Sequence, residues 1–303
     1  TTASSSSQRK WLPTCGSDSR TVTHLDQLLD PKSIAIVGLS DDGSKHGGRV
    51  LASLRKVGYT GHIWGVHPRT PEVRGVEMFD SLLSLPEAPD LVASAVPSTA
   101  VPGIIRDAGT GGAGAVVVFA GGFAEAGPSG SAAQLELATI ATEHGVRVLG
   151  PNSGGVIRLG SRLAVSFLTC LDRPADQIRP GPVGLVTQSG GTGSYIHNLA
   201  AERGTGLGVS ISVGNESDID IADGNKALAE LDEIRAIAIV METVRDGQRF
   251  LDAISAARAA GKPIVVCRLG ASEHGRAMTA THTGAMARPA VVLDGVLASL
   301  GIT

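Results

Sequence analysis

The chain has 303 residues, of which 42% are apolar, so it is long enough for about two globular domains with a sizeable core in each. A formal charge of −3, 3% aromatic residues and the lack of an apolar run of roughly 18 residues argue against nucleic acid and membrane as partners. Cys15, Cys170 and Cys267 are too scattered for a disulfide framework or a thiolate metal site. We therefore expect a cytoplasmic protein without a metal site of its own.

The first segment, residues 1–22, is expected to be a disordered tail, because it begins with a tract made almost entirely of Ser and Thr. This tract lacks the apolar core of a signal peptide. From Leu25 onward, short β-branched runs alternate with segments of helical spacing, which is typical of βαβ units and a parallel sheet. The fold class is therefore α/β.

Residues 23–152 are predicted to form a first doubly wound domain. Its expected strands are Ser33–Gly38, His62–Val66, Leu91–Val96, Ala115–Ala120 and Val146–Gly150, each buried on both faces. A polar, Pro-rich stretch at Asp172–Pro182 interrupts the pattern, and residues 153–303 are predicted to form a second α/β domain. Its expected strands are Val183–Thr187, Leu207–Val213, Ile234–Val240 and Ile264–Arg268.

The glycine-rich loop at residues 38–48 follows the first strand and leads into a helix, where backbone N–H groups and the helix dipole favour an anion. The fingerprint G-x-G-x-x-G is absent, and the second strand ends at His67-Pro68-Arg69 instead of an acidic residue, which disfavours ordinary NAD binding. A cationic strand end suits the extra phosphate of NADP or the 3′-phosphate of coenzyme A. The alternative is a glycine-rich turn without a ligand.

A second anion site is predicted at Ser189, Gly190 and Gly191, where a strand enters a turn of small residues before a helical stretch at Tyr195–Arg203. A nucleophile elbow at Ser189 is a competing interpretation. It would need glycine at position 187, which is Thr.

A third candidate is His282, in a loop rich in glycine and alanine that follows the last expected strand. A lone histidine is more often structural than catalytic. Glu242, at the end of the Ile234–Val240 run, could orient its imidazole, and the carboxyl ends of parallel strands are where ligands bind. His274 is the rival in the same loop, although its neighbours indicate a solvated turn.

Seven motifs in register make the chain recognisable from about Leu25 to Gly301. They are LDPKSIAIVG at 29–38, AVPSTAVP at 95–102, FAGGFAEAG at 119–127, LGPNSGGV at 149–156, VTQSGG at 186–191, SVGNESDID at 212–220 and THTGAMA at 281–287. The sequence resembles the NDP-forming acyl-CoA synthetases, the superfamily of succinyl-CoA synthetase alpha subunits and ADP-forming acetyl-CoA synthetases. The resemblance implies a Rossmann-like CoA-binding domain followed by a flavodoxin-like domain.

The resemblance also implies roles for individual residues. His282 would be the phosphorylated histidine, Glu242 would hold its imidazole, and Ser189, Gly190 and Gly191 would bind phosphate. The implied CoA-binding residues are Gly38, Ser40, Lys45, His67, Pro68, Arg69, Val96, Pro97 and Asn152, the last in a turn that should face Ser189. The run Gly190-Gly191-Thr192 departs from the family, where an apolar residue is common, and so does Ser153-Gly154.

The implied activity interconverts acyl-CoA, phosphate and NDP with carboxylate, CoA and NTP through an acyl phosphate and a phosphohistidine. An ATP-grasp beta subunit or domain would bind ADP/ATP or GDP/GTP with Mg²⁺, in an oligomeric assembly. No ATP-grasp pattern is found here, so the chain is either a subunit or part of a longer polypeptide. The acyl group is left open. Two alternatives remain: a non-catalytic CoA- or nucleotide-sensing module, and an NADP-linked oxidoreductase.

Overall fold

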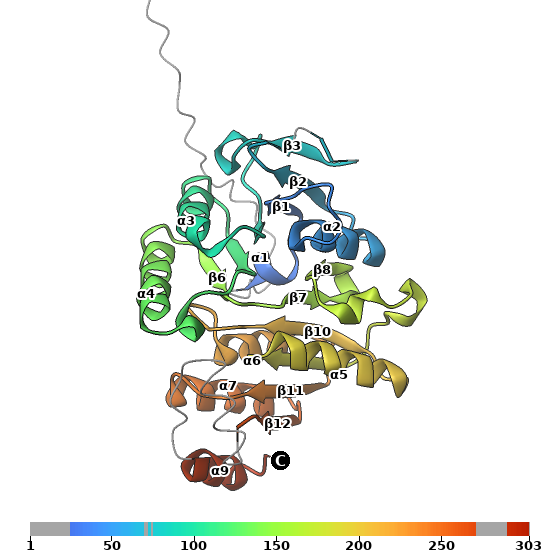
Figure 1. Cartoon of the computed structure of the whole chain (residues 1–303). Coiled ribbons are helices and arrows are strands. Elements are labelled where there is room, and N and C mark those ends of the chain that lie inside the picture. Colours follow the sequence, from blue (N-terminus) through green and yellow to red (C-terminus); the bar gives the residue numbers. More distant parts are fainter. Residues whose placement is uncertain (1–24, 70–71, 74, 271–289, 303) are drawn as a thin grey trace, which may run out of the picture.

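The computed structural model describes residues 25–69, 72–73, 75–270 and 290–302 (Figure 1). The predicted tail at residues 1–22 lies outside the described residues. Two six-stranded sheets form the framework, and helices cover both faces of each sheet. Among the described residues, no helix is long and apolar enough to cross a membrane.

The first sheet is entirely parallel and has the strand order β3-β2-β1-β4-β5-β6. Its strands are β1 (Ser33–Val37), β2 (His62–Val66), β3 (Glu77–Phe79), β4 (Leu91–Ser94), β5 (Ala115–Val118) and β6 (Arg147–Leu149). Its helices are α1 (Asp26–Leu29), α2 (His46–Val57), α3 (Val101–Thr110) and α4 (Pro128–Glu143). This is the predicted doubly wound arrangement.

Strand β1 shows why the runs of the first sheet are mostly apolar, since successive side chains point to opposite faces and both faces are covered. Ile34 and Ile36 pack in the cluster that includes Leu54 of α2. Ala35 and Val37 pack in the cluster that includes residues of α3 and α4. Strand β2 departs from the expected full burial, because His62 at its start is exposed.

The second sheet has the order β12-β11-β9-β10-β7-β8. Its strands are β7 (Gly155–Arg158), β8 (Leu163–Val165), β9 (Val183–Thr187), β10 (Leu207–Ser212), β11 (Ala236–Met241) and β12 (Ile264–Arg268). Strands β9 to β12 are parallel, whereas β7 and β8 run antiparallel at one edge. The sequence prediction found the parallel strands and missed this antiparallel pair.

Helix α5 (Gly190–Glu202) covers the face of the second sheet that carries Leu185, and α6 (Ile221–Glu230) and α7 (Gly247–Ala259) cover the opposite face. The last described helix is α9 (Ala290–Ser299). Helix α5 begins before the predicted Tyr195, because the Ser189 hydroxyl caps it by accepting the N–H of Thr192 at 3.2 Å. Short 3₁₀ turns complete the chain at Leu82–Ser84, Ser98–Ala100, Ala124–Ala126, Leu159–Ser161, Thr169–Asp172 and Ala175–Gln177.

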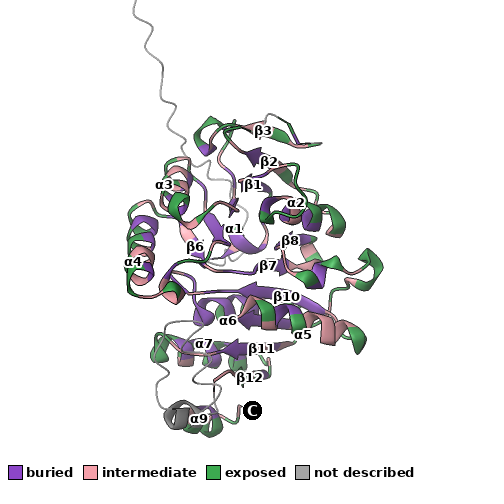
Figure 2. Ribbon diagram, in the orientation of Figure 1, coloured by how far each residue is buried: buried purple, intermediate pink, exposed green. Residues whose placement is uncertain are grey.

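The two sheets share one hydrophobic core. A single cluster of buried side chains includes Ile36 and Leu149 of the first sheet together with Val156 and Val186 of the second. Figure 2 shows that the strands of both sheets are largely buried, while exposed residues lie on the outer sides of the helices. Polar contacts join the halves as well, since Arg147 pairs with Asp218 at 2.8 Å. The carboxyl ends of the two sets of parallel strands are thereby held in a fixed relation.

Candidate active site

A cavity of about 1120 Å³ lies at the carboxyl ends of β1, β2 and β4. Eight of the nine residues that the sequence predicts to bind CoA line it, and these are Gly38, Ser40, Lys45, His67, Pro68, Arg69, Val96 and Pro97. They come from three strand ends that are distant in sequence and adjacent in the sheet. The topology therefore brings these predicted residues together at one site.

The glycines around this cavity permit a close backbone approach. Gly38 has φ +84°, and a Cβ there would lie 2.6 Å from the carbonyl oxygen of Ala95. A Cβ on Gly47 would lie 2.9 Å from the carbonyl oxygen of Gly38. Packing thus requires both glycines, so their presence alone does not indicate a ligand. What indicates a ligand site is the cavity that Gly38 borders.

Cationic side chains lie at the mouth of this cavity. Lys45 and Arg69 are exposed, and the backbone N–H of Arg69 donates to Nδ1 of His67 at 3.1 Å. Two acidic residues, Asp80 and Asp107, also line the wall. Asp80 accepts a hydrogen bond from the Ser84 hydroxyl at 2.6 Å, and this bond lowers the pKa of its carboxyl. An anion is therefore best received on the side of Lys45 and Arg69.

A second cavity, of about 780 Å³, is lined by residues from both halves of the chain. Asn152 lies on its wall together with Ser189, Gly190 and Gly191, which confirms that the turn at Gly150–Asn152 faces Ser189. Asn152 lines this cavity and not the larger one, so it lies apart from the other residues predicted to bind CoA. The reason is local: the chain reverses after β6 with Asn152 at φ +56° and enters the second sheet. Ser44 and His46 line both cavities, so the two are contiguous.

The amino end of α5 forms one wall of this second cavity. The Ser189 hydroxyl is engaged as the helix cap, which disfavours the nucleophile interpretation. A Cβ on Gly191 would have nothing within 4 Å, whereas one on Gly190 would lie 3.3 Å from Cα of Gly154. Free backbone N–H groups at a helix start, beside small residues and open space, suit a phosphate.

Gln188 connects this helix start to Glu242. Its side-chain Oε1 accepts the backbone N–H of Glu242 at 2.6 Å and that of Thr243 at 3.1 Å, and its Nε2 donates to the Thr243 carbonyl at 2.9 Å. The amide thus holds the chain just after β11 against the chain just after β9. Gln188 lies in the motif VTQSGG at 186–191, and the sequence alone did not assign it a role. An amide side chain at a strand end, directly before a helix cap, is the signal that could have identified it.

Glu216 is a second residue that the sequence did not single out. Burial raises the pKa of Glu216 to about 7, the negative charge of Asp220 adds to this, and Arg245 and a hydrogen bond from Gln188 oppose it. Its Oε1 accepts the N–H of Ile221 at 2.9 Å, and its backbone has φ +57°. A buried carboxyl beside Gln188 therefore lies next to the Glu242 turn.

Three aromatic rings meet on the wall of the second cavity, and one of them, His46, also lines the first. The imidazole of His46 stacks on Phe167 with ring centroids 4.1 Å apart, and Phe119 meets Phe167 edge-on at 5.4 Å. Burial, assisted by the nearby Arg49 charge, lowers the pKa of His46. Arg49 also fixes this wall, because its Nε donates to the Phe167 carbonyl at 3.0 Å and its guanidinium pairs with Asp172 at 2.9 Å.

The predicted phosphohistidine, His282, lies outside the described residues, as does its rival His274. The strand that leads toward them is described: β12 pairs with β11 in parallel, and the N–H of Leu269 donates to the carbonyl of Met241 at 2.8 Å. The chain therefore leaves β12 directly beside the residue that precedes Glu242.

Comparison with known proteins assigns both halves of the chain to families. Residues 32–158 match a CoA binding domain, and residues 180–303 match a succinyl-CoA ligase like flavodoxin domain. A trans-feruloyl-CoA synthase from an unknown prokaryotic organism is 35% identical, over 92% of this chain and 39% of its own length. The alpha subunit of an ADP-forming acetate–CoA ligase I from Pyrococcus furiosus is 33% identical, over 92% of this chain and 60% of its own length.

Comparison of the structure with solved structures finds a protein of the same family. An acetyl-coenzyme A synthetase from Ca. Korarchaeum cryptofilum, solved with phosphate and ADP, superimposes with a TM-score of 0.85 at 31% identity. The match covers 93% of this chain and 59% of that protein. The chain thus spans between about two fifths and three fifths of the length of these relatives.

Proposed function

Because both of its domains make the chain a member of the NDP-forming acyl-CoA synthetase superfamily, we propose that it is the acyl-transferring and phosphoryl-transferring portion of such a synthetase. The observation that carries this proposal is the contiguity of two cavities. One is lined by the residues predicted for CoA, and the other by the start of α5. A CoA bound in the first cavity would present its thiol at the second.

CoA fits the larger cavity by size and charge. Its adenosine 3′-phosphate would lie against Arg69 at the end of β2, and its pyrophosphate near Lys45. The pantetheine arm would pass Ser44 and His46, which line both cavities. Acyl-CoA supplies the thioester; the residues of the chain would hold it and position its carbonyl carbon near Asn152.

The first chemical step is attack of inorganic phosphate on the thioester carbonyl. The C–S bond breaks, the CoA thiolate leaves and an acyl phosphate forms. The backbone N–H groups at Gly190 and Gly191 would hold the phosphate oxygens during this step, because both residues line the second cavity at the start of α5.

The second step transfers the phosphoryl group to His282. A ring nitrogen attacks phosphorus, the P–O bond to the acyl group breaks and the carboxylate leaves. Glu242 would orient the imidazole and stabilise the positive charge that develops on it, as carboxylate partners of histidine commonly do. Gln188 would hold Glu242 in place through its backbone.

The remaining nucleotide step is assigned to an ATP-grasp subunit or segment with ADP/ATP or GDP/GTP and Mg²⁺. Two relatives from Pyrococcus furiosus are named as alpha subunits, and ADP is present in the Korarchaeum structure, which supports a partner of this kind. We place the chain in the cytoplasm because its three cysteines are too scattered in the sequence for a disulfide framework.

Ligand-dependent melting separates this proposal from the two alternatives. CoA is expected to raise the melting temperature and NADPH is not, since only a ligand of the native state stabilises it. A rise with NADPH alone would favour the oxidoreductase. Stabilisation by CoA without any phosphoryl transfer would favour the sensing module.

Phosphorylation of His282 is the direct test. With acyl-CoA and labelled phosphate, the wild-type chain should gain an acid-labile, base-stable label, and His282→Ala should lose the label while retaining CoA binding. Glu242→Gln keeps the size and removes the charge, so it should slow labelling by roughly 10² to 10⁴ without unfolding the protein. Label that persists in His282→Ala, or that maps to His274, would contradict the assignment.

A further inference from the structure

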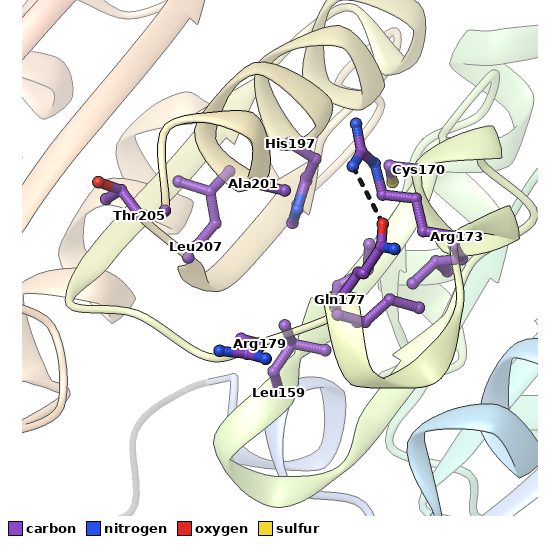
Figure 3. A pocket seen from close by; sticks show the side chains of 14 residues that line it. Leu159, Cys170, Arg173, Gln177, Arg179, His197, Ala201, Thr205 and Leu207 are labelled. Carbon is purple, nitrogen blue, oxygen red and sulfur yellow. Dashed lines mark hydrogen bonds between the residues drawn. The ribbon is translucent and has the colours of Figure 1, made fainter.

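A third cavity, of about 280 Å³, lies at the carboxyl half of α5, away from the amino end of that helix at the candidate active site (Figure 3). It shares no lining residue with the two cavities described above. Its walls come from the end of β7, the 3₁₀ turns at 169–172 and 175–177, the last turns of α5 and the start of β10. It is therefore a separate cavity, formed between the second sheet and α5.

Apolar side chains make up much of the wall of this cavity. They are Ile157, Leu159, Leu171, Ile178, Ala201 and Leu207. A protein cavity of about 150 Å³ is large enough for benzene, so a volume of about 280 Å³ has room for a molecule of roughly ten non-hydrogen atoms. The walls thus favour a ligand with an apolar body.

The charges on the wall have one sign. Two arginines, Arg173 and Arg179, line the cavity, and none of the Asp or Glu residues that the structure describes lines it. Arg173 is engaged by Asn198 at 2.7 Å and by Glu202 at 3.1 Å. Arg179 donates through Nε to the Asp176 carbonyl and, in the described part of the chain, has no carboxylate partner. Its guanidinium can therefore receive an anion at the opening.

His197 contributes a neutral polar group. Its imidazole points toward the space between Leu207 and Gln177 (Figure 3), and its Nε2 is buried without a hydrogen-bond partner among the described residues. Burial lowers the pKa of His197 to about 4, so the ring carries no charge near pH 7. Burial also raises the pKa of the Cys170 thiol, which keeps it protonated and disfavours a covalent ligand.

We propose that this cavity binds a small organic acid, with its carboxylate at Arg179 and its apolar body in the space beside Leu207 and His197. The proposal does not rest on the proposed function. It has a consequence for the active site, because the Ser194 hydroxyl, on the wall of the second cavity, accepts the N–H of Cys170 at 3.0 Å. Cys170 lines the third cavity, so an acid bound there would contact a residue that is hydrogen-bonded to the α5 wall of the second cavity.

The probe for this site is 3-phenylpropionate, compared with its uncharged amide by titration calorimetry on the whole chain. The acid is expected to bind and the amide to bind at least tenfold more weakly. Arg179→Gln should weaken the acid at least tenfold, and Arg235→Gln, an exposed arginine before β11, should leave it unchanged. Equal affinity of acid and amide, or full affinity in Arg179→Gln, would overturn the proposal.

The site at which the acid binds must be measured separately, because a synthetase also holds a carboxylate at its active site. A diazirine derivative of the same acid should crosslink to residues 157–159, 170–179 or 197–207, and Ala201→Leu, which fills the cavity, should abolish these crosslinks. Crosslinks confined to residues 44–46, 152–154 and 188–191 would place the acid at the candidate active site and overturn the proposal. That result would leave the proposed function intact.

Discussion

Oε1 of Gln188 accepts the backbone N–H of Glu242 at 2.6 Å, across 54 positions of sequence. Since Ser189 follows Gln188 and caps α5, one side chain fixes the distance between the phosphate-binding helix start and the carboxylate proposed to hold His282. The relative position of these two groups is therefore set by a bond that substitution can remove.

Gln188→Met keeps the length of the side chain and removes all three hydrogen bonds to the Glu242–Thr243 turn. Partners that orient a reacting group typically contribute 10- to 100-fold, so phosphohistidine formation should slow by about that factor. CoA affinity should not change. Gln248→Met, on an exposed face of α7, is the matched control. Adding Gln188→Met to Glu242→Gln should cost little more than Glu242→Gln alone; a full multiplicative loss would show that Gln188 does not act through Glu242.

Arg69→Ala should weaken CoA much more than dephospho-CoA, because only CoA carries the 3′-phosphate that Arg69 is proposed to meet. A hydrogen bond to a charged group contributes about 1.5–3 kcal/mol, so a loss of roughly 10- to 100-fold is expected for CoA. Calorimetric titration of both ligands measures the difference, with Arg235→Ala as the control. Equal losses for the two ligands would remove Arg69 from this role.

Glu216 should make the protein less stable as the pH rises. Burial raises the pKa of Glu216 from 4.5 to about 7, so the folded state binds this proton more tightly than the unfolded state does. Its stabilising contribution is complete below about pH 4.5 and is lost as the pH rises through 7. At 1.36 kcal/mol per pKa unit, the loss is about 3 kcal/mol.

Glu216→Gln keeps an acceptor for the Ile221 N–H and does not titrate. Relative to wild type, its free energy of unfolding should therefore rise by about 3 kcal/mol between about pH 4.5 and pH 8, as measured by urea denaturation. Glu230→Gln, at an exposed position of α6, is the control and should show no such trend. A constant difference between Glu216→Gln and wild type across this range would contradict the shifted pKa.

Gly191→Leu should narrow the second cavity without unfolding the protein, because a side chain there meets nothing within 4 Å of its Cβ. CoA affinity should persist, acetyl transfer should continue, and kcat/KM for bulkier acyl groups should fall about tenfold or more. Gly247→Leu, at the start of α7 and equally uncrowded, is the control for helix and solubility effects. An unchanged ratio of small to bulky acyl substrates would show that Gly191 does not bound the acyl site.

The sequence predicted those elements whose pattern is set by burial on both faces. The runs at 33–38 and 183–187 are mostly apolar because helices cover both sides, and they became β1 and β9. Strands β3, β7 and β8 were missed because they have only three or four residues, and their pairing depends on partners elsewhere in the chain. Strand β11 begins at Ala236 instead of the expected Ile234.

The residues of the candidate site also divide into those that the sequence predicted and those that depend on distant contacts. Strand ends and helix starts can be predicted from the chain, so Arg69 and Ser189 were named at positions where cavities lie. The contacts of Gln188 and Glu216 could not be predicted. Gln188 reaches across to the end of β11, and the pKa of Glu216 depends on burial that only the packed second sheet creates. The turn that carries Asn152 was expected to face Ser189 from the family resemblance, whereas the chain reversal after β6 that places it there is not encoded in the spacing.

Strands β7 and β8 precede the Pro-rich stretch Asp172–Pro182, yet they belong to the sheet that the rest of the chain builds after it. Ser210 of β10 pairs with Ile157 of β7 across that stretch. A protease nick there would cut the connection between β8 and β9 of the second sheet. It would leave the boundary between the domains intact. Each fragment would lack strands that only the other possesses, so the two pieces should be recovered as a non-covalent complex and neither should refold alone.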